Sequence, residues 1–328
     1  MKKDYDNPAA FIIPHFSTGI KIERRWLIEA LDSINQQTDR NWKIIIVDDA
    51  SPSQEDINFL KQLKNDFAEK MEIILLPENK GPGNARNIGI QKASELGCPF
   101  VLLLDQDDIC HPKRVEVTRE IFRTQPAVGV VYSTFQFIDE MGNHVPRENV
   151  MPSICEILDQ HDTNPPQGKD VWIRIATDTG YINLTSTTSV RTDVAFKYPF
   201  PNERVSEDYY AWLVYSASGA EYAYSSLIPA KYRIPQDGPR GRSSFGELYV
   251  FNIVKSVIDT RGFQAAAKLA QSRGELTEDQ LKIIKIKFYI RKAKFMAIDG
   301  ETEIAEDFYN RAMDVDKEMT EKFLKGLL

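Results

Sequence analysis

The chain has 328 residues, of which 42% are hydrophobic and 27% charged, and its formal net charge is −7. No basic tract stands out, which argues against nucleic-acid binding, because that function requires clustered Lys and Arg. The negative balance leaves room for a positively charged cofactor such as a metal ion. The length predicts one large domain plus a smaller one.

Cysteine content and the first residues favour a cytoplasmic protein. The three cysteines, Cys98, Cys110 and Cys155, form no CxxC pair, and such usage is typical of a reducing compartment. The apolar run within residues 1–14 is too short for a signal peptide, and no window approaches 18 apolar residues. We therefore expect no membrane span.

Strand and helix patterns alternate from residue 9 to residue 139. Strands are predicted at 9–14, 42–51, 71–79, 100–104 and 127–139, and helices at 23–37, 54–68, 83–97 and 112–124. Such alternation predicts an α/β fold with a parallel sheet covered by helices on both faces. Ligands of these sheets bind beyond the carboxyl ends of the strands.

The rest of the chain changes character twice. Pro, Gly and Thr are frequent at 140–245, which predicts an irregular wall over the sheet with one helix at 207–219. Helical spacing returns from 245 to 328, where Thr277 and Gln280 have the spacing of a helix start and the last two segments form a candidate antiparallel pair. We therefore predict a domain at 1–243 and a helical region at 244–328.

Three carboxylates follow a predicted buried strand within four positions: Asp105, Asp107 and Asp108. Like charges this close repel unless something positive lies among them. An acidic turn facing water is one interpretation. We reject an EF-hand loop, because its sixth position would be Cys110 instead of Gly and Pro112 falls inside it. The third interpretation is a turn that holds Mn²⁺ or Mg²⁺ together with a diphosphate.

Asp48 and Asp49 end another predicted strand. An N-cap or Asx turn would explain them, but two strands of one sheet then deliver paired carboxylates to the same edge. The following segment, ENKGPGNARNIG at 78–89, resembles a dinucleotide loop but lacks its third glycine, which disfavours that function. Arg86 would instead place a cation near a phosphate at a helix N-terminus. A plain capped helix is the simpler alternative.

In this order and spacing, FIIPHF, IIIVDDAS, NKGPGNARNIG and LLLDQDDICHP resemble the nucleotide-sugar half of the inverting family 2 glycosyltransferases with the GT-A fold. SEDYYAW at 206–212 is similar to the Glu-Asp signature of that family, and KYRIPQDGPRGRS at 231–243 to its closing Tyr-Arg loop. The resemblance spans residues 9–243. It implies a GT-A-like sheet and transfer from a nucleotide-diphosphate sugar, above all a UDP-sugar, to a hydroxyl of a glycan, glycolipid or glycoprotein, with Mn²⁺ or Mg²⁺ as cofactor.

The resemblance also implies roles for individual residues. Asp49 would hydrogen-bond the nucleotide base, Asp105 would contact the ribose, and Asp107 would bind the metal. Asp208, beside Glu207, would be the catalytic base. The arginines of the closing loop would bind the leaving diphosphate; they are Arg233, Arg240 and Arg242. The other residues expected in the nucleotide-sugar site are Pro14, His15, Phe16, Asp48, Arg86 and Gln106.

Sugar transfer explains these residue types. The anomeric carbon becomes cationic while the diphosphate gains charge, which a metal and arginines stabilise. A carboxylate on the opposite face takes the proton of the acceptor hydroxyl. The pKa of this base need not rise far, because the base must be ionised at neutral pH. Asp208 and Glu207 at a predicted helix start fit this requirement, since the helix dipole favours a carboxylate there. Ordinary N-capping is the competing explanation.

Two departures from the family pattern bear on the site. Ser17 stands where Asn is frequent. Pro235 and Gln236 occupy the place of a frequent His, which leaves a third protein ligand for the metal unassigned. Inversion of the anomeric carbon rests on the family resemblance alone.

Two other functions are kept as alternatives. A sugar-phosphate nucleotidyltransferase would have a Gly-rich loop after the first strand, where only Gly19 occurs. A non-catalytic nucleotide-sugar-binding module would be favoured by loss of Asp107 or Asp208, and both are present.

The segment 281–298 carries six basic residues and no acidic ones. An interfacial helix would place them at a lipid surface, which is the basis for considering peripheral membrane contact. The apolar residues, however, go most of the way round the helix. That distribution favours a helix packed between neighbours, with lysines extending to solvent and pairing with the acidic segment 301–318.

Overall fold

The computed structural model describes residues 5–235 and 248–326. Arg240, Arg242 and most of the closing loop predicted at 231–243 lie outside these residues. The strands are β1 (Ala9–His15), β2 (Trp42–Asp48), β3 (Met71–Leu75), β4 (Phe100–Leu103), β5 (Val128–Ile138), β6 (Thr188–Arg191) and β7 (Glu221–Arg233). The helices are α1 (Lys21–Asn35), α2 (Gln54–Phe67), α3 (Pro82–Glu95), α4 (Arg114–Thr124), α5 (Pro152–Thr163), α6 (Val171–Arg174), α7 (Thr192–Lys197), α8 (Glu207–Ala217), α9 (Leu248–Ser272), α10 (Glu278–Ile298), α11 (Thr302–Val315) and α12 (Lys317–Leu324).

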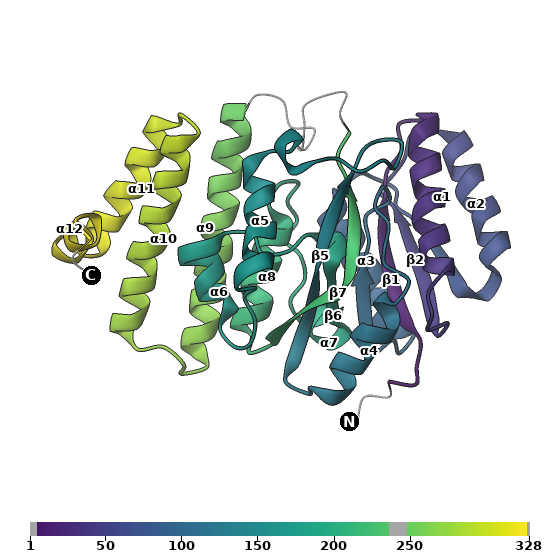
Figure 1. Cartoon of the computed structure of the whole chain (residues 1–328), viewed down its shortest axis with the longest axis horizontal. Coiled ribbons are helices and arrows are strands. Elements are labelled where there is room, and N and C mark those ends of the chain that lie inside the picture. The colour runs from purple at the N-terminus through teal and green to yellow at the C-terminus, as the bar shows by residue number, and fades with distance from the viewer. Residues whose placement is uncertain (1–4, 236–247, 327–328) are drawn as a thin grey trace.

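The strands form one mixed sheet in the order β3-β2-β1-β4-β6-β5-β7 (Figure 1). β1 to β4 pair in parallel, as predicted. β6 is antiparallel to both β4 and β5, so the expectation of a parallel sheet is wrong for this half. β7 pairs with β5 in parallel at the end of the sheet, where Pro229 is tolerated because an edge strand leaves one side of its backbone unpaired.

The sheet is buried on both faces by helices. Alternate residues of β1 point to opposite faces. Ala10 and Ile12 belong to a core that α3, α8, α9 and α10 cover, whereas Phe11 and Ile13 belong to a core under α1, α2 and α4. The predicted helices on both faces are thereby confirmed.

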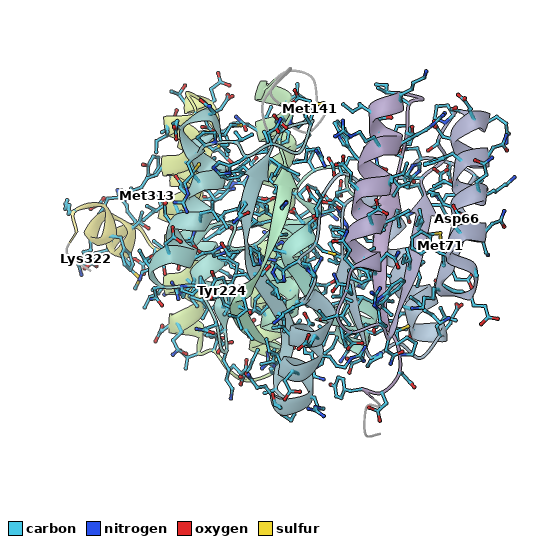
Figure 2. All side chains as sticks on the ribbon, turned by 45° about the vertical axis from the view of Figure 1, so that its right-hand side comes forward. Asp66, Met71, Met141, Tyr224, Met313 and Lys322 are labelled. Atoms are coloured by element: carbon cyan, nitrogen blue, oxygen red, sulfur yellow. The ribbon has the colours of Figure 1, made fainter. Side chains whose placement is uncertain are left out.

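The C-terminal helices continue the first of these cores. Phe263 of α9 and Phe288 of α10 stack with ring centroids 4.1 Å apart and are fully buried. The molecule extends from α2, which carries Asp66, at one end to α12, which carries Lys322, at the other (Figure 2). α9 is one helix across Gly262, where a Cβ would come 3.0 Å from the backbone of Tyr210 on α8. This glycine lets the two helices approach closely.

Two predictions for this region are confirmed and one is corrected. Thr277 and Gln280 form the capping box that begins α10. Lys282 of α10 pairs with Asp316 at 3.7 Å, within the predicted acidic segment. Lys292, expected to reach solvent, is buried, because an acidic side chain of α9 lies opposite it. Among residues 5–235 and 248–326, no helix has the length and apolar character needed to cross a membrane.

Candidate active site

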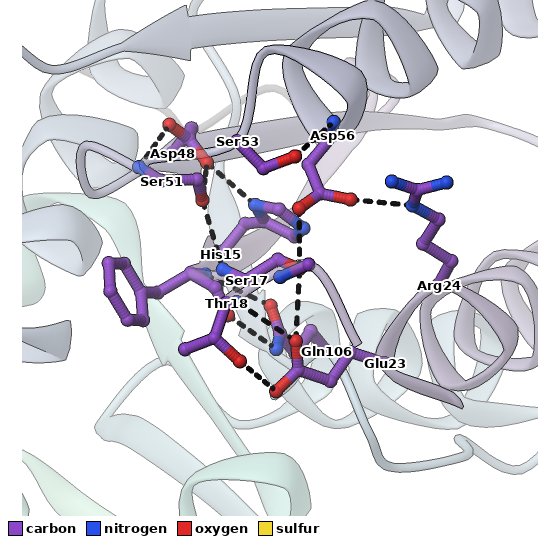
Figure 3. Close-up of polar contacts among 12 residues, drawn as sticks. His15, Ser17, Thr18, Glu23, Arg24, Asp48, Ser51, Ser53, Asp56 and Gln106 are labelled. Atoms are coloured by element: carbon purple, nitrogen blue, oxygen red, sulfur yellow. Dashed lines mark hydrogen bonds and ion pairs between the residues drawn. The ribbon is translucent and has the colours of Figure 1, made fainter. Parts of the chain in front are cut away.

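The turn after β1 is fastened to the end of β2 (Figure 3). Pro14 lies within β1, in register with Val47. The His15 Nδ1 atom lies 2.7 Å from Oδ1 of Asp48, and the Ser51 hydroxyl donates to the same oxygen at 2.5 Å. Burial alone would raise the pKa of Asp48, but the hydrogen bonds from His15 and Ser51 keep it below its ordinary value. Asp48 therefore fixes the shape of this turn.

Phe16 is the exposed member of the turn. Gln106 holds its backbone from the carboxyl end of β4: the Phe16 N–H donates to Oε1 at 3.1 Å, and Nε2 donates to the Phe16 carbonyl at 3.0 Å. The Phe16 side chain is 39% exposed. A half-exposed aromatic ring held by a fixed backbone suits stacking on a planar ligand.

Ser17 anchors a polar network that sequence reasoning missed (Figure 3). Its hydroxyl contacts Oδ2 of Asp56 and Oε2 of Glu23, each at 2.9 Å. Arg24 donates to Asp56 at 2.5 Å. The network ties the turn to the starts of α1 and α2. The identity of residue 17 was the only sequence signal, because it departs from the family pattern.

Asp49 binds the loop that precedes α3. Its carboxylate accepts the backbone N–H groups of Lys80 at 2.9 Å and Gly81 at 2.6 Å. Gly81 has φ +91°, a conformation that favours glycine. Asp49 is buried, and in this structure it positions the start of α3.

Arg86 brings the two halves of the site together. It lies on α3, one turn before Gly89, where a Cβ would come 2.6 Å from Ile12 of β1. Its guanidinium donates to Oδ1 of Asp105 at 2.7 Å and to Oε1 of Glu207 at 2.9 Å. Burial would lower the pKa of Arg86, but the carboxylates of Asp105 and Glu207 raise it above its ordinary value. The close packing of α3 on the sheet thus joins the ends of β4 and α8.

The three carboxylates of the DQDD turn differ in burial and in hydrogen bonding. Asp105 accepts the Thr185 hydroxyl at 2.5 Å in addition to Arg86. Asp107 is half-buried, and burial, followed by repulsion from Asp105, raises its pKa to about 6. Asp108 is fully buried and accepts the backbone N–H of Arg233 at 2.8 Å. Within the described part of the chain, no group of three His, Cys, Asp or Glu side chains is arranged to hold a metal on its own.

The Arg233 guanidinium is directed inward. It donates to the carbonyl of Asp107 at 2.7 Å, the carbonyl of Asp139 at 2.8 Å and the carboxylate of Glu29 at 2.6 Å. The side chain is fully buried. Sequence reasoning assigned it to the leaving diphosphate, but these contacts engage it in holding the Asp107 turn.

Asp208 lies at the start of α8. Oδ1 accepts the backbone N–H of Tyr209 at 2.8 Å and the hydroxyl of Tyr181 at 3.1 Å. Burial, followed by repulsion from Glu207, raises the pKa of Asp208 to about 7. The pKa rises further than the helix dipole alone led us to expect, because burial and Glu207 outweigh Arg86 and the hydrogen bonds from Tyr209 and Tyr181, which lower it. No sequence signal pointed to Tyr181.

These features match a known family. The family model described as Glycosyl transferase family 2 matches residues 11–193, more than half of the chain. The chain belongs to this family. The match includes the carboxylate pairs at the ends of β2 and β4 and ends before Asp208. The predicted family and the GT-A-like fold expected of it are thereby confirmed.

Family members differ widely in length. An uncharacterized glycosyltransferase, MJ1057 of Methanocaldococcus jannaschii, is 25% identical over 235 residues, which cover 71% of this chain and 74% of that protein. An uncharacterized glycosyltransferase of Rickettsia felis is 30% identical over 141 residues, 43% of this chain and 21% of that protein. The chain thus matches about a fifth of the length of the Rickettsia relative.

Solved structures share the fold over nearly the whole chain. Staphylococcus aureus TarS 1-349 in complex with UDP superposes with a TM-score of 0.54 at 15% identity, over 97% of this chain and 92% of that one. The mannosyltransferase PcManGT from Pyrobaculum calidifontis, in complex with GDP-Man and Mn²⁺, superposes with a TM-score of 0.54 at 12% identity, over 98% and 79%. At these identities the likeness shows the fold alone.

Proposed function

We propose that this glycosyltransferase moves a sugar from a nucleotide-diphosphate sugar, with a UDP-sugar as the first candidate, to an acceptor hydroxyl with inversion and in a metal-dependent reaction. The observation that carries this proposal is the bridge made by Arg86. One buried guanidinium binds Asp105, at the edge where nucleotides bind in α/β sheets, and Glu207, next to Asp208. The nucleotide-sugar donor and the catalytic base would thus lie next to each other.

Asp208 is our candidate for the base. A carboxylate with a pKa of about 7 is ionised in part at neutral pH and is a stronger base than an exposed aspartate. It would take the proton of the acceptor hydroxyl as that oxygen bonds to the anomeric carbon and the bond to the diphosphate breaks. Repulsion from the neighbouring Glu207, which pairs with Arg86, adds to the effect of burial and raises the proton affinity of Asp208.

The other edge of the site supports a nucleotide. Phe16 would stack on the base, and the fixed turn behind it depends on His15 and Asp48. Asp49 and Asp105, which make internal hydrogen bonds here, would reach the base and ribose only after local rearrangement. TarS is named in complex with UDP and UDP-GlcNAc, and PcManGT with GDP-Man, which supports a nucleotide-sugar donor for this chain.

Asp107 fits a divalent cation. Its carboxylate supplies a hard oxygen ligand. Its pKa is raised by burial and then by repulsion from Asp105, and a cation would relieve that repulsion. Asp107 would hold Mn²⁺ or Mg²⁺, with donor diphosphate oxygens making up the ligand set. The bound ion would stabilise the charge of the leaving diphosphate. Arg233 would support the metal site by fixing the backbone of Asp107.

A donor panel tests the proposal. Thermal shift of the purified protein with UDP-, GDP- and dTDP-sugars, each with and without Mn²⁺, should give a stabilisation by UDP-sugars that requires the metal. Transfer to glycan, glycolipid and glycoprotein acceptors is then assayed, and the anomeric configuration of the product is read by NMR. Stabilisation without metal would refute metal dependence, and a retained configuration would refute inversion.

A further inference from the structure

A buried charge cluster lies between α9 and α10, beyond the residues that the family model matches. Asp259 of α9 is fully buried and binds two ammonium groups, Lys255 Nζ at 2.6 Å and Lys292 of α10. Burial would raise the pKa of Asp259, but the two lysines hold it at about 2. Buried ion pairs contribute little net stability compared with apolar packing, so the cluster calls for a functional explanation.

The cluster reaches Asp208 through two hydroxyl groups. Ser206 Oγ donates to Oδ1 of Asp259 at 2.6 Å and accepts from Lys255 at 3.3 Å. The same oxygen lies 2.8 Å from the Tyr181 hydroxyl, which in turn donates to Oδ1 of Asp208 at 3.1 Å. A continuous row of closely spaced oxygen atoms therefore joins the C-terminal helices to the carboxylate at the start of α8.

The backbone and the aromatic rings hold this chain in place. Ser206 has φ +58°, which is uncommon for a residue other than glycine, and its hydroxyl contacts offset the strain. Lys255 Nζ lies 5.1 Å from the ring centroid of Tyr181 and 5.3 Å from that of Tyr209, within cation–π range. The Tyr181 side chain is thus held by the cation–π contact at its ring and by the hydrogen-bond contacts of its hydroxyl.

Each hydroxyl of the chain has one hydrogen to donate. The Ser206 hydrogen goes to Asp259, so towards Tyr181 the Ser206 oxygen can act only as an acceptor. The Tyr181 hydrogen goes to Asp208 when that carboxylate is ionised, and this charge-assisted hydrogen bond is stronger than the neutral contact left once Asp208 is protonated. Tyr181 therefore stabilises the ionised form of Asp208 more than the protonated form.

We propose that the buried cluster of α9 and α10 positions Asp208 through Ser206 and Tyr181, so that the C-terminal helices belong to the machinery of sugar transfer. This inference rests on the proposed function of Asp208 as the base. The cluster residues touch no reacting atom and are positioning residues. The titratable and charged groups that face Asp208 or this chain are Arg86, Glu207, Tyr209, Tyr232, Lys255, Asp259, Arg291 and Lys292.

The test compares Tyr181→Phe and Lys292→Met with Lys294→Met, which makes the same Lys-to-Met change on the exposed side of α10. Tyr181→Phe should leave donor Kd unchanged and lower kcat at pH 7 by about tenfold or more. Losing a hydrogen bond or a nearby positive charge disfavours ionised Asp208, so in both variants the acid limb of kcat should move upward by about half a pH unit or more. Lys294→Met should behave as wild type. Unshifted acid limbs in the first two variants would overturn the inference.

A second measurement needs no substrate. The stability effects of Tyr181→Phe and Asp208→Asn are measured singly and together at pH 6 and pH 8. A coupling that differs between the two pH values supports the inference, and additivity at both overturns it. A wild-type protein that transfers no sugar overturns the proposed function, and this cycle then decides the inference. Should Lys292→Met fail to fold, Tyr181→Phe, which lacks one hydroxyl, carries the test.

Discussion

Arg86 and Glu207 form a buried ion pair across 121 residues of sequence, with Nη1 and Oε1 2.9 Å apart. The same guanidinium binds Asp105 at 2.7 Å. One side chain therefore neutralises carboxylates from the end of β4 and from the start of α8. Because all three groups lie at the site, the pair links its geometry to the stability of the fold.

Replacing Arg86 should destabilise the fold. Arg86→Gln leaves two carboxylates near each other without a cation, and the free energy of unfolding should fall by about 3 kcal/mol in urea denaturation. The control is Arg261→Gln, which removes an exposed arginine that pairs with Glu203. Its effect should be below about 1 kcal/mol. Equal effects of the two substitutions would show that the Arg86 bridge contributes no more than a surface pair.

Asp208→Asn should separate binding from chemistry. Donor affinity should persist, whereas transfer should fall by on the order of 10²–10⁴ because no group accepts the proton. In the wild type, the base must be ionised, so kcat should rise with pH through about 7 and then level off. A loss below about tenfold, or a rate that is flat between pH 6 and 8, would exclude Asp208 as the base.

Asp208→Asn should raise the stability of the fold at high pH, although it lowers activity. The folded-state pKa of Asp208 is raised from 3.8 to about 7, so its favourable contribution is present below 3.8 and is lost as pH rises through about 7. The neutral side chain in Asp208→Asn does not ionise, so the variant does not lose this contribution as pH rises. Its melting temperature should therefore exceed that of the wild type at pH 8 and equal it near pH 4.

Sequence patterns predicted the elements that are long or strongly periodic. β1, β2 and β4 are continuous apolar runs buried on both faces, and the carboxylates that follow β2 and β4 led to the candidate site. β6 was missed because four residues carry too little pattern. β7 was missed because Ser225, Ser226 and Pro229 interrupt the apolar pattern expected of a strand.

Contacts between distant segments were beyond sequence reasoning. Nothing near Tyr181 marks it as the neighbour of Asp208, and nothing near Asp259 marks it as a buried group, since both depend on how α8, α9 and α10 pack. The role expected for Arg233 came from its place after Tyr232 in the closing loop. Its direction depends on Glu29, which is distant in sequence and lies on α1.

Asp107→Ala should abolish metal-dependent nucleotide binding while the fold persists, because the substitution removes one of several mutually repelling carboxylates. Calorimetry of UDP with Mn²⁺ should give no measurable heat of binding for this variant. Asp314→Ala, at an exposed position of α11, is the control and should bind as the wild type does. Unchanged affinity in Asp107→Ala would refute the assignment of Asp107 to the metal.

α10 should not anchor the protein to lipid. Its buried face includes Ile286 and Phe288, which are fully buried, and Lys292 is paired inside the fold. Only part of its basic charge therefore remains for a membrane surface. Co-sedimentation with anionic vesicles at about 0.15 M salt should leave the protein in the supernatant. Strong sedimentation that Lys285→Glu and Lys287→Glu abolish would instead establish peripheral membrane contact and direct the acceptor search to glycolipids.

Arg233 should act on metal binding through the backbone of Asp107. Arg233→Lys retains the charge but has one nitrogen where the guanidinium uses three separate nitrogens to reach Asp107, Asp139 and Glu29. UDP affinity in the presence of Mn²⁺ should fall several-fold. Glu29→Gln, which weakens the contact with Arg233 and the more exposed pair with Arg25, should reproduce part of that fall. If Arg233 held the diphosphate directly, Glu29→Gln would leave UDP affinity unchanged or raise it by freeing the guanidinium. Calorimetry of both variants with UDP and Mn²⁺ distinguishes these two roles.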